Sequence, residues 1–238
     1  MNINYYLKKL KGNPLALLKR AIIKTCVEPF RYATKNGYQA EKYWQDRHAK
    51  YGMDILGPGD HTQTKEENIK MYQEAREIFI KTCRKDISDF KNIKVLEIGC
   101  GNGFYTQILN DLGVLNYTAL DIVDVLFPEL RKKFPSYRFL KKDVSQKPIE
   151  GQFDLIVMID VIEHIVEKAK FQFALKNIQT ALAPSGKFYL SPVGDKSGRH
   201  LYYVYFWSLE EITSAMEGCR VNSRIPFRFS QLLTIAKG

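Results

Sequence analysis

The sequence has no long apolar run and no closely spaced pair of cysteines. None of its hydrophobic stretches approaches the ~20 residues that a membrane-spanning helix needs, and its amino-terminal segment lacks the apolar core of a secretory signal. The four cysteines (Cys26, Cys83, Cys100 and Cys219) are far apart in the sequence and form no C-x-x-C motif, which argues against a disulfide framework or a zinc site. We therefore expect a cytoplasmic protein.

Negative charge is scarce in the first part of the chain. Residues 1–50 contain eleven Lys and Arg but only three acidic residues, so they carry +8 of the total formal charge of +10. The rest of the chain is nearly balanced and shows no basic groove with interleaved aromatic residues, which argues against DNA as a partner. The basic character therefore belongs to the amino-terminal segment.

The most informative stretch runs from Val95 to Thr106. An apolar run over 93–98 predicts a buried parallel strand, glycines follow at alternate positions (Gly99, Gly101 and Gly103), and an apolar period typical of a helix begins at Phe104. Glycines at such a turn allow unusual φ angles and let a ligand approach the backbone. Asp121 lies 22 residues after Gly99, a spacing suited to binding ribose hydroxyls.

The alternation of apolar runs and helical periods predicts an α/β fold with a doubly wound sheet and a ligand at the carboxyl ends of the strands. The expected strands lie near 93–98, 116–121, 137–140, 153–159, 186–191, 219–224 and 231–236, and the expected helices near 65–89, 103–112, 125–133, 163–182 and 208–217. Thr64 with Glu67, and Ser208 with Glu211, have the spacing of helix capping boxes.

Four sequence blocks resemble the class I S-adenosylmethionine-dependent methyltransferases. Val95–Thr106 resembles their glycine motif, Asp121-Ile122 their ribose-binding position, Lys142-Asp143-Val144 the acidic position next to the adenine, and Phe153–Ile165 their fourth strand with its loop. The resemblance covers about residues 90–238. It implies a Rossmann-like seven-stranded sheet with an antiparallel last strand, preceded here by an amino-terminal helical extension.

The same resemblance implies a methyltransferase with S-adenosylmethionine as its methyl donor. Glu97 would support the glycine turn and the amino group of the donor, Asp121 would accept both ribose hydroxyls, and Asp143 would accept from the adenine amino group. Taken singly, Asp121 or Asp143 could instead be a helix cap or a turn residue. The implied donor-binding residues are Glu97, Gly99, Cys100, Gly101, Asn102, Gly103, Asp121, Ile122, Asp143, Val144 and Ile159.

Asp160, Glu163 and His164 would form one cluster if the chain turned helical after the fourth strand. Our choice for a catalytic residue is His164, as a general base that removes a proton from the methyl acceptor. Two alternatives stay open: Glu163 and His164 brace the loop, or the cluster, with His200, binds a divalent cation. Metal-dependent relatives have Glu at the position of Asp160, so we assign no metal.

The segment before the glycine turn is predicted to form an extension and lid over residues 1–64, with the donor-binding domain over 65–238. Leu15, Leu18, Ile22 and Cys26 share one helical face, and we expect Pro29 to end that helix. The helix either packs on the core or a second subunit, or lies on an anionic membrane or a phosphorylated substrate, with residues 5–35 as the candidate contact. Aromatic residues near Tyr43 and Trp44 and the loop from Gly57 to His61 suggest a lid, or a surface helix that fills a packing gap.

The acceptor is expected to be a small molecule or a sugar or glycan, methylated on oxygen or nitrogen. Residues 194–203, which include Arg199, His200, Tyr202 and Tyr203, either line its pocket or form a polar connection. A donor-binding scaffold without catalysis is the alternative from a different class, and an RNA methyltransferase is disfavoured because Asp160–Glu163 lacks an N/D-P-P-Y/F block. The oligomeric state stays open.

Overall fold

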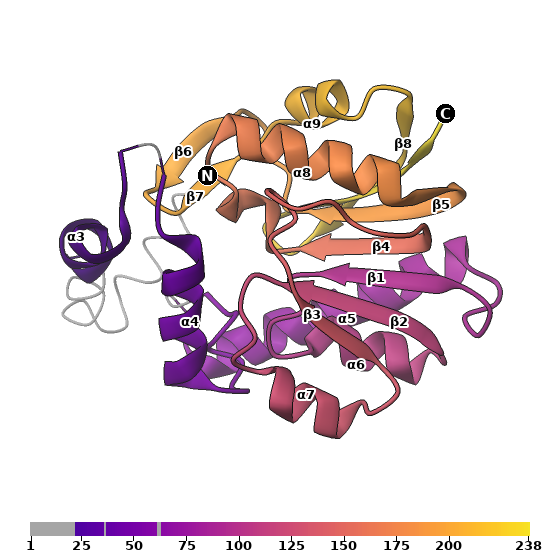
Figure 1. Ribbon diagram of the computed structural model, residues 1–238, viewed down its shortest axis with the longest axis horizontal. Helices are drawn as coiled ribbons and strands as arrows, with labels where there is room; N and C mark the ends of the chain where they lie inside the picture. The colour runs from indigo at the N-terminus through magenta and orange to yellow at the C-terminus, as the bar shows by residue number, and fades with distance from the viewer. Residues whose placement is uncertain (1–21, 36, 61–62) are drawn as a thin grey trace.

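The computed structural model describes residues 22–35, 37–60 and 63–238. Its centre is a seven-stranded sheet of order β3-β2-β1-β4-β5-β9-β8 (Figure 1). The strands of this sheet are β1 (Lys94–Ile98), β2 (Asn116–Asp121), β3 (Arg138–Lys141), β4 (Phe153–Ile159), β5 (Leu182–Ser191), β8 (Cys219–Phe227) and β9 (Ser230–Lys237).

The strand order and directions confirm the predicted Rossmann-like sheet. β1 pairs in parallel with β2 and β4, β2 with β3, and β4 with β5, whereas β9 runs antiparallel to both β5 and β8. The order reverses at β1, so the carboxyl ends of β1 and β4 diverge and leave room for a ligand.

Two helical layers cover the sheet. Helices α5, α6 and α7 lie on one face and α8 and α9 on the other (Figure 1), and their apolar side chains pack against the sheet. The helices are α5 (Lys65–Asp86), α6 (Phe104–Asp111), α7 (Phe127–Lys133), α8 (Lys168–Ala181) and α9 (Leu209–Ala215). Among the described helices, none combines the length and the apolar character needed to cross a bilayer.

Two of the described helices, α5 and α9, start at the capping residues that the sequence predicts. Thr64 accepts from the Glu67 backbone N–H at 3.1 Å and the Glu67 carboxylate accepts from the Thr64 N–H at 2.9 Å, which confirms the capping box of α5. Ser208 likewise accepts from the Glu211 N–H, but the Glu211 carboxylate binds Ser197 and Lys168 instead of closing a box.

The expectation of a continuous helix over 163–182 is wrong. Asp160 has a left-handed φ of 58°, a single 3₁₀ turn follows at Ile162–His164, and α8 begins only at Lys168. Because Asp160 leaves the helical region, the three residues Asp160, Glu163 and His164 do not have helical i+3 and i+4 spacing.

Residues 194–203 are not a simple loop. They contribute to a two-stranded antiparallel ribbon of β6 (Gly198–Leu201) and β7 (Val204–Phe206) outside the main sheet. Tyr203, in the turn of this ribbon, and Val204 join an aromatic cluster with Tyr32, Tyr38 and Tyr43 from the amino-terminal helices.

The amino-terminal part begins with a π-helical turn, η1 (Ile23–Val27), followed by α3 (Glu28–Tyr32) and α4 (Ala40–Tyr51). The expectation that Pro29 ends a helix is wrong, because Pro29 stands in the first turn of α3, where the missing N–H has no intrahelical acceptor to lose. Leu15 and Leu18, and most of the candidate contact segment 5–35, lie outside the described residues.

Candidate functional site

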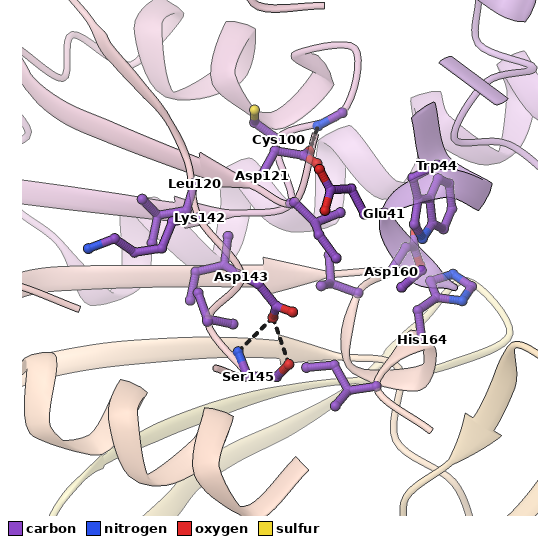
Figure 2. A pocket seen from close by; sticks show the side chains of 18 of the residues that line it. Glu41, Trp44, Cys100, Leu120, Asp121, Lys142, Asp143, Ser145, Asp160 and His164 are labelled. Carbon is purple, nitrogen blue, oxygen red and sulfur yellow. Dashed lines mark hydrogen bonds between the residues drawn. The ribbon is translucent and has the colours of Figure 1, made fainter. Parts of the chain in front are cut away.

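A cavity of about 900 Å³ lies at the carboxyl ends of β1, β2, β3 and β4. The carboxyl ends of these strands and the residues that follow them form one wall of the cavity, and α4 forms the opposite wall (Figures 1 and 2). The lining includes nine of the predicted donor-binding residues, namely Gly99, Cys100, Gly101, Asn102, Asp121, Ile122, Asp143, Val144 and Ile159, together with His164.

The three glycines of the turn have left-handed φ angles of 75°, 48° and 79°. A Cβ at Gly99 would lie 2.2 Å from a methyl of Val161, and a Cβ at Gly103 would lie 2.5 Å from Leu130, so packing requires glycine at both positions. A Cβ at Gly101 would instead meet no atom closer than 4.0 Å and would occupy open cavity space. Gly101 is therefore the glycine at which a ligand can reach the backbone.

Asp121 is buried at the end of β2 and holds the glycine turn in place. One carboxylate oxygen accepts from the Gly101 N–H at 3.0 Å and the other from the Val123 N–H at 3.2 Å. Burial raises the pKa of Asp121 to about 6, and these backbone donors oppose the rise. Each oxygen has a further lone pair, so the carboxylate can accept from two hydroxyls in the cavity.

Asp143 lies after β3 and is engaged in its own turn. Its Oδ1 accepts from the Ser145 N–H at 2.8 Å and from the Ser145 hydroxyl at 2.6 Å (Figure 2), and its Oδ2 accepts from the Gln146 side chain. The side chain thus serves as the turn residue that the sequence left as an alternative, while it also lines the cavity.

The loop after Asp143 is held by hydrogen bonds from a residue of α8 that sequence reasoning missed. The Asn177 side chain, on α8, donates to the carbonyls of Val144 and Lys147 and accepts from the Ile149 N–H at 2.6 Å. A lone Asn on an apolar helix face gives no signal of this role.

Glu97 and Gly103 do not line the cavity. The Glu97 carboxylate is buried behind the glycine turn, where it accepts from Thr106 Oγ1 at 2.9 Å and from the Tyr117 hydroxyl. Burial raises the pKa of Glu97 to about 7, although the hydrogen bonds from Tyr117 and Thr106 oppose the rise. Glu97 thus ties β1 to α6 and β2, and this structure gives it no direct access to a ligand.

His164 lines the cavity next to Trp44, to which its ring is edge-on (Figure 2), and the same ring stacks on Tyr203. Its Nδ1 lies 2.9 Å from the Tyr203 carbonyl oxygen, which can only accept, so Nδ1 carries the proton and Nε2 is free of one. Burial lowers the pKa of His164 to about 4. The ring is therefore neutral at pH 7, with Nε2 able to accept a proton.

The expected cluster of Asp160, Glu163 and His164 is split. Asp160 forms an ion pair with Arg228, whereas Glu163 is buried with Oε1 3.8 Å from His164 Nε2. Burial, followed by the nearby charge of Asp160, raises the pKa of Glu163 well above its usual range. Arg228 comes from the turn between β8 and β9, and sequence spacing gave no hint of it.

The α4 wall is aromatic. Trp44 and His48 stack at 5.6 Å and line the cavity together with Tyr38. Burial lowers the pKa of His48 to about 4, so this ring is also neutral at pH 7. The sequence suggested Trp44 for a lid but missed His48 as a lining residue.

Arg47 fastens this wall to the rest of the protein. Its guanidinium donates to the carbonyls of Gly57 and Gly59 and to the Tyr43 hydroxyl at 2.9 Å. The loop so held brings Pro58 to the cavity, opposite Gly101. Tyr43, Arg47 and the glycine loop, which the sequence singled out together, are thus in contact.

The charges and shapes of the site suit a ligand with hydroxyl and amino groups. The carboxylates of Asp121 and Asp143 line the cavity at the ends of neighbouring strands β2 and β3, and the glycine turn after β1 offers open backbone next to Asp121. The opposite wall is aromatic and carries neutral imidazoles. Such a cavity can hold a nucleoside against the strands and a second reactant against α4.

Comparison with known proteins matches residues 96–190 to a family model described as methyltransferase domain. The malonyl-[acyl-carrier protein] O-methyltransferase of Priestia megaterium is 27% identical over 170 residues, which cover 60% of this chain and 59% of that protein. A ubiquinone biosynthesis O-methyltransferase of Pseudomonas aeruginosa is 24% identical over 117 residues, covering 47% of this chain and 49% of that protein. The chain thus spans only about half the length of these two relatives.

Solved structures share the fold. The N-methyltransferase NodS from Bradyrhizobium japonicum, in complex with S-adenosyl-L-homocysteine, aligns with a TM-score of 0.59 at 16% identity and covers 82% of this chain and 97% of that one. CalS10, an amino pentose methyltransferase from Micromonospora echinaspora with bound S-adenosylmethionine, aligns with a TM-score of 0.58 at 14% identity. The alignment covers 70% of this chain and 92% of that one.

Proposed function

We propose that the chain moves a methyl group from S-adenosylmethionine to an oxygen or nitrogen atom, starting from the match of residues 96–190 to a methyltransferase domain. The acceptor we propose is a small molecule or a sugar or glycan. One observation carries the proposal: nine residues implied for the donor by the sequence resemblance surround a single cavity.

The donor would lie along the strand ends. Asp121 would accept from the ribose hydroxyls with the lone pairs that Gly101 and Val123 leave unused. The loop of Asp143 and Val144 would contact the adenine, and the open backbone at Gly101 would lie against the methionine part. The observed cavity fits this assignment, because its carboxylates and its uncovered glycine face the same space.

The reaction asks the protein mainly for orientation. The acceptor atom would attack the methyl carbon in line with the sulfur, the carbon–sulfur bond would break, and S-adenosylhomocysteine would leave. The proton of the acceptor needs a base, and His164, whose Nε2 is unprotonated, lines the cavity. The alternative, that His164 and Glu163 only brace the loop, is supported by the stacking of His164 on Tyr203.

We assign the acceptor to the α4 side of the cavity. Trp44, His48 and Tyr38 offer flat faces and neutral ring nitrogens, which suit a small molecule or a sugar ring. The names of these relatives refer to malonyl-[acyl-carrier protein], to ubiquinone biosynthesis and to an amino pentose, and this varied chemistry does not single out one acceptor.

Residues 1–64 are proposed as an extension and lid of this domain. The support is that α4 walls the cavity and that Arg47 ties α4 to the loop bearing Pro58. A cytoplasmic location is proposed from the cysteines, because Cys26, Cys83, Cys100 and Cys219 are all free thiols.

Titration calorimetry with S-adenosylhomocysteine tests donor binding, and transfer of a labelled methyl group to fractions of a cell extract tests catalysis. Micromolar binding together with a labelled product would support the proposal. Binding without a labelled product in broad extracts would favour the non-catalytic scaffold. No binding at all would refute both.

A further inference from the structure

The helical segment from Ile22 to Tyr32 differs from an ordinary surface helix, which buries its apolar side chains. Its apolar side chains face solvent: Phe30 is 94% exposed, Val27 57%, Ile22 48% and Ile23 36%. Four exposed apolar side chains on nine consecutive residues form a contiguous patch, which we call the apolar face.

Two charged side chains of the same segment, Lys24 and Glu28, point into the protein. Lys24 pairs with Glu28 at 2.8 Å, and the two side chains are only 18% and 22% exposed. Lys24 also donates to the Tyr43 hydroxyl, and Glu28 accepts from the Tyr202 hydroxyl at 2.9 Å. These bonds fix the orientation of the segment, so the apolar face cannot turn inward without breaking them.

Basic residues flank the apolar face in the sequence. Arg31 and Lys35, just after it, are exposed, and Arg31 also pairs with Asp46 at 2.9 Å. In the sequence, residues 1–21, which lead into Ile22, contain five Lys and Arg and no acidic residue. Apolar side chains flanked by basic residues match the surface of a bilayer that contains anionic lipids, where apolar groups enter the interface and basic groups bind the headgroups.

We propose that the apolar face is a membrane-docking surface that seats the protein on an anionic lipid bilayer. The surface consists of Ile22, Ile23, Val27 and Phe30, with Arg31 and Lys35 at its edge. Its inner side packs through Lys24 and Glu28 on the aromatic cluster that continues to Trp44 of the cavity. Docking would therefore keep the α4 side of the cavity next to the bilayer.

Flotation of the full chain with lipid vesicles tests this surface. Vesicles of phosphatidylcholine with about 30 mol % phosphatidylglycerol should bind the protein at least about tenfold more strongly than pure phosphatidylcholine, with a loss at high salt. The double variant Val27→Ser/Phe30→Ser should bind anionic vesicles about tenfold or more weakly. Phe173→Ser, which removes an exposed Phe on α8, is the matched control and should bind as the wild type does.

A fluorescent label at Cys26 gives a second readout. Cys26 is exposed beside the apolar face, Cys83 and Cys100 are buried, and Cys219 can be replaced by Ser. Anionic vesicles should shift the emission of an environment-sensitive dye at Cys26 to the blue and protect it from iodide quenching. Each variant should have the same midpoint temperature of thermal unfolding as the wild type, which shows that the fold is kept.

Three results would overturn the proposal: no flotation of the wild type, equal flotation of the double variant, or a dimer in size-exclusion chromatography that the double variant converts to a monomer. The last result would assign the surface to a second copy of the chain. None of these readouts involves methyl transfer, so they are independent of the proposed function.

Discussion

Asp160 and Arg228 form an ion pair across 68 residues of sequence, and both have left-handed backbone φ angles, of 58° and 53°. Asp160 directly follows β4 at the cavity, and Arg228 reaches it from the turn between β8 and β9. The Arg228 guanidinium also lies over the Tyr72 ring at 4.7 Å. Two costly backbone conformations thus meet in one largely buried contact.

Replacing Arg228 by Met should lower the free energy of unfolding by about 3 kcal/mol, because a partly buried carboxylate loses its partner. Urea unfolding measures this loss. Arg224→Met, which removes an exposed arginine of β8, should change the stability by less than about 0.5 kcal/mol. Equal effects of the two substitutions would contradict a stabilising role for the pair.

Replacing Asp121 by Ala should weaken the binding of S-adenosylhomocysteine by roughly 10- to 100-fold. Hydrogen bonds to a charged group contribute about 1.5–3 kcal/mol, and the glycine turn also loses an acceptor. Calorimetry provides the measurement. Asp124→Ala removes a nearby carboxylate that is largely exposed, and this variant should bind the ligand normally.

Replacing His164 by Ala should leave donor binding intact and lower kcat by roughly 10²- to 10⁴-fold, as expected for the loss of a general base. His200→Ala, on exposed β6, is the control and should be fully active. Because burial lowers the pKa of His164 to about 4, this group should not limit kcat/KM above about pH 5.5, and activity should fall as pH approaches 4. A stable His164→Ala variant with unchanged kcat would leave only the bracing role.

Glu97 should make stability depend on pH. Its folded pKa of about 7 exceeds the ordinary value of 4.5, so between these values the folded state keeps a proton that the unfolded state releases. Glu97 therefore makes its full contribution to the free energy of unfolding below about pH 4.5. This contribution, on the order of 3 kcal/mol, is lost as the pH rises through about 7. Glu97→Gln removes this titration. Urea unfolding of both proteins from pH 4.5 to 8 should show a gap that widens with pH, and parallel curves would contradict the assignment.

Replacing Arg47 by Met should loosen α4. The carbonyls of Gly57 and Gly59 lose their donor, at a cost of about 1–3 kcal/mol for each group left unpaired. Limited proteolysis should then cut within residues 40–60 faster than in the wild type, and donor affinity should fall about tenfold. Lys50→Met, at an exposed position of the same helix, should match the wild type in both measurements.

Local patterns were sufficient to predict the sheet and one wall of the cavity. The apolar run of β1, the glycines after it and the carboxylate of Asp121 are all encoded within about thirty residues, and their geometry follows from the strand-turn-helix unit. The capping box at Thr64 likewise needs only a spacing of three residues.

The parts that could not be predicted depend on distant partners. The left-handed φ of Asp160 accompanies an ion pair with Arg228 from the last hairpin, and this conformation delays the start of α8 to Lys168. The orientation of Lys24 and Glu28 depends on hydroxyls of Tyr43 and Tyr202, which no periodicity reveals. A helical pattern shows which residues share a face but not whether that face is buried.

The wall formed by α4 has a consequence for how this chain could change over evolutionary time. None of the 12 residues of α4 pairs with a strand of the sheet. Arg47 joins the helix to a neighbouring loop by donating to main-chain carbonyls, and every amino acid has such a carbonyl. Mutations could therefore reshape that half of the cavity while the half at the strand tips stays as it is. Chimeras that exchange this helix alone offer a direct route to new selectivity.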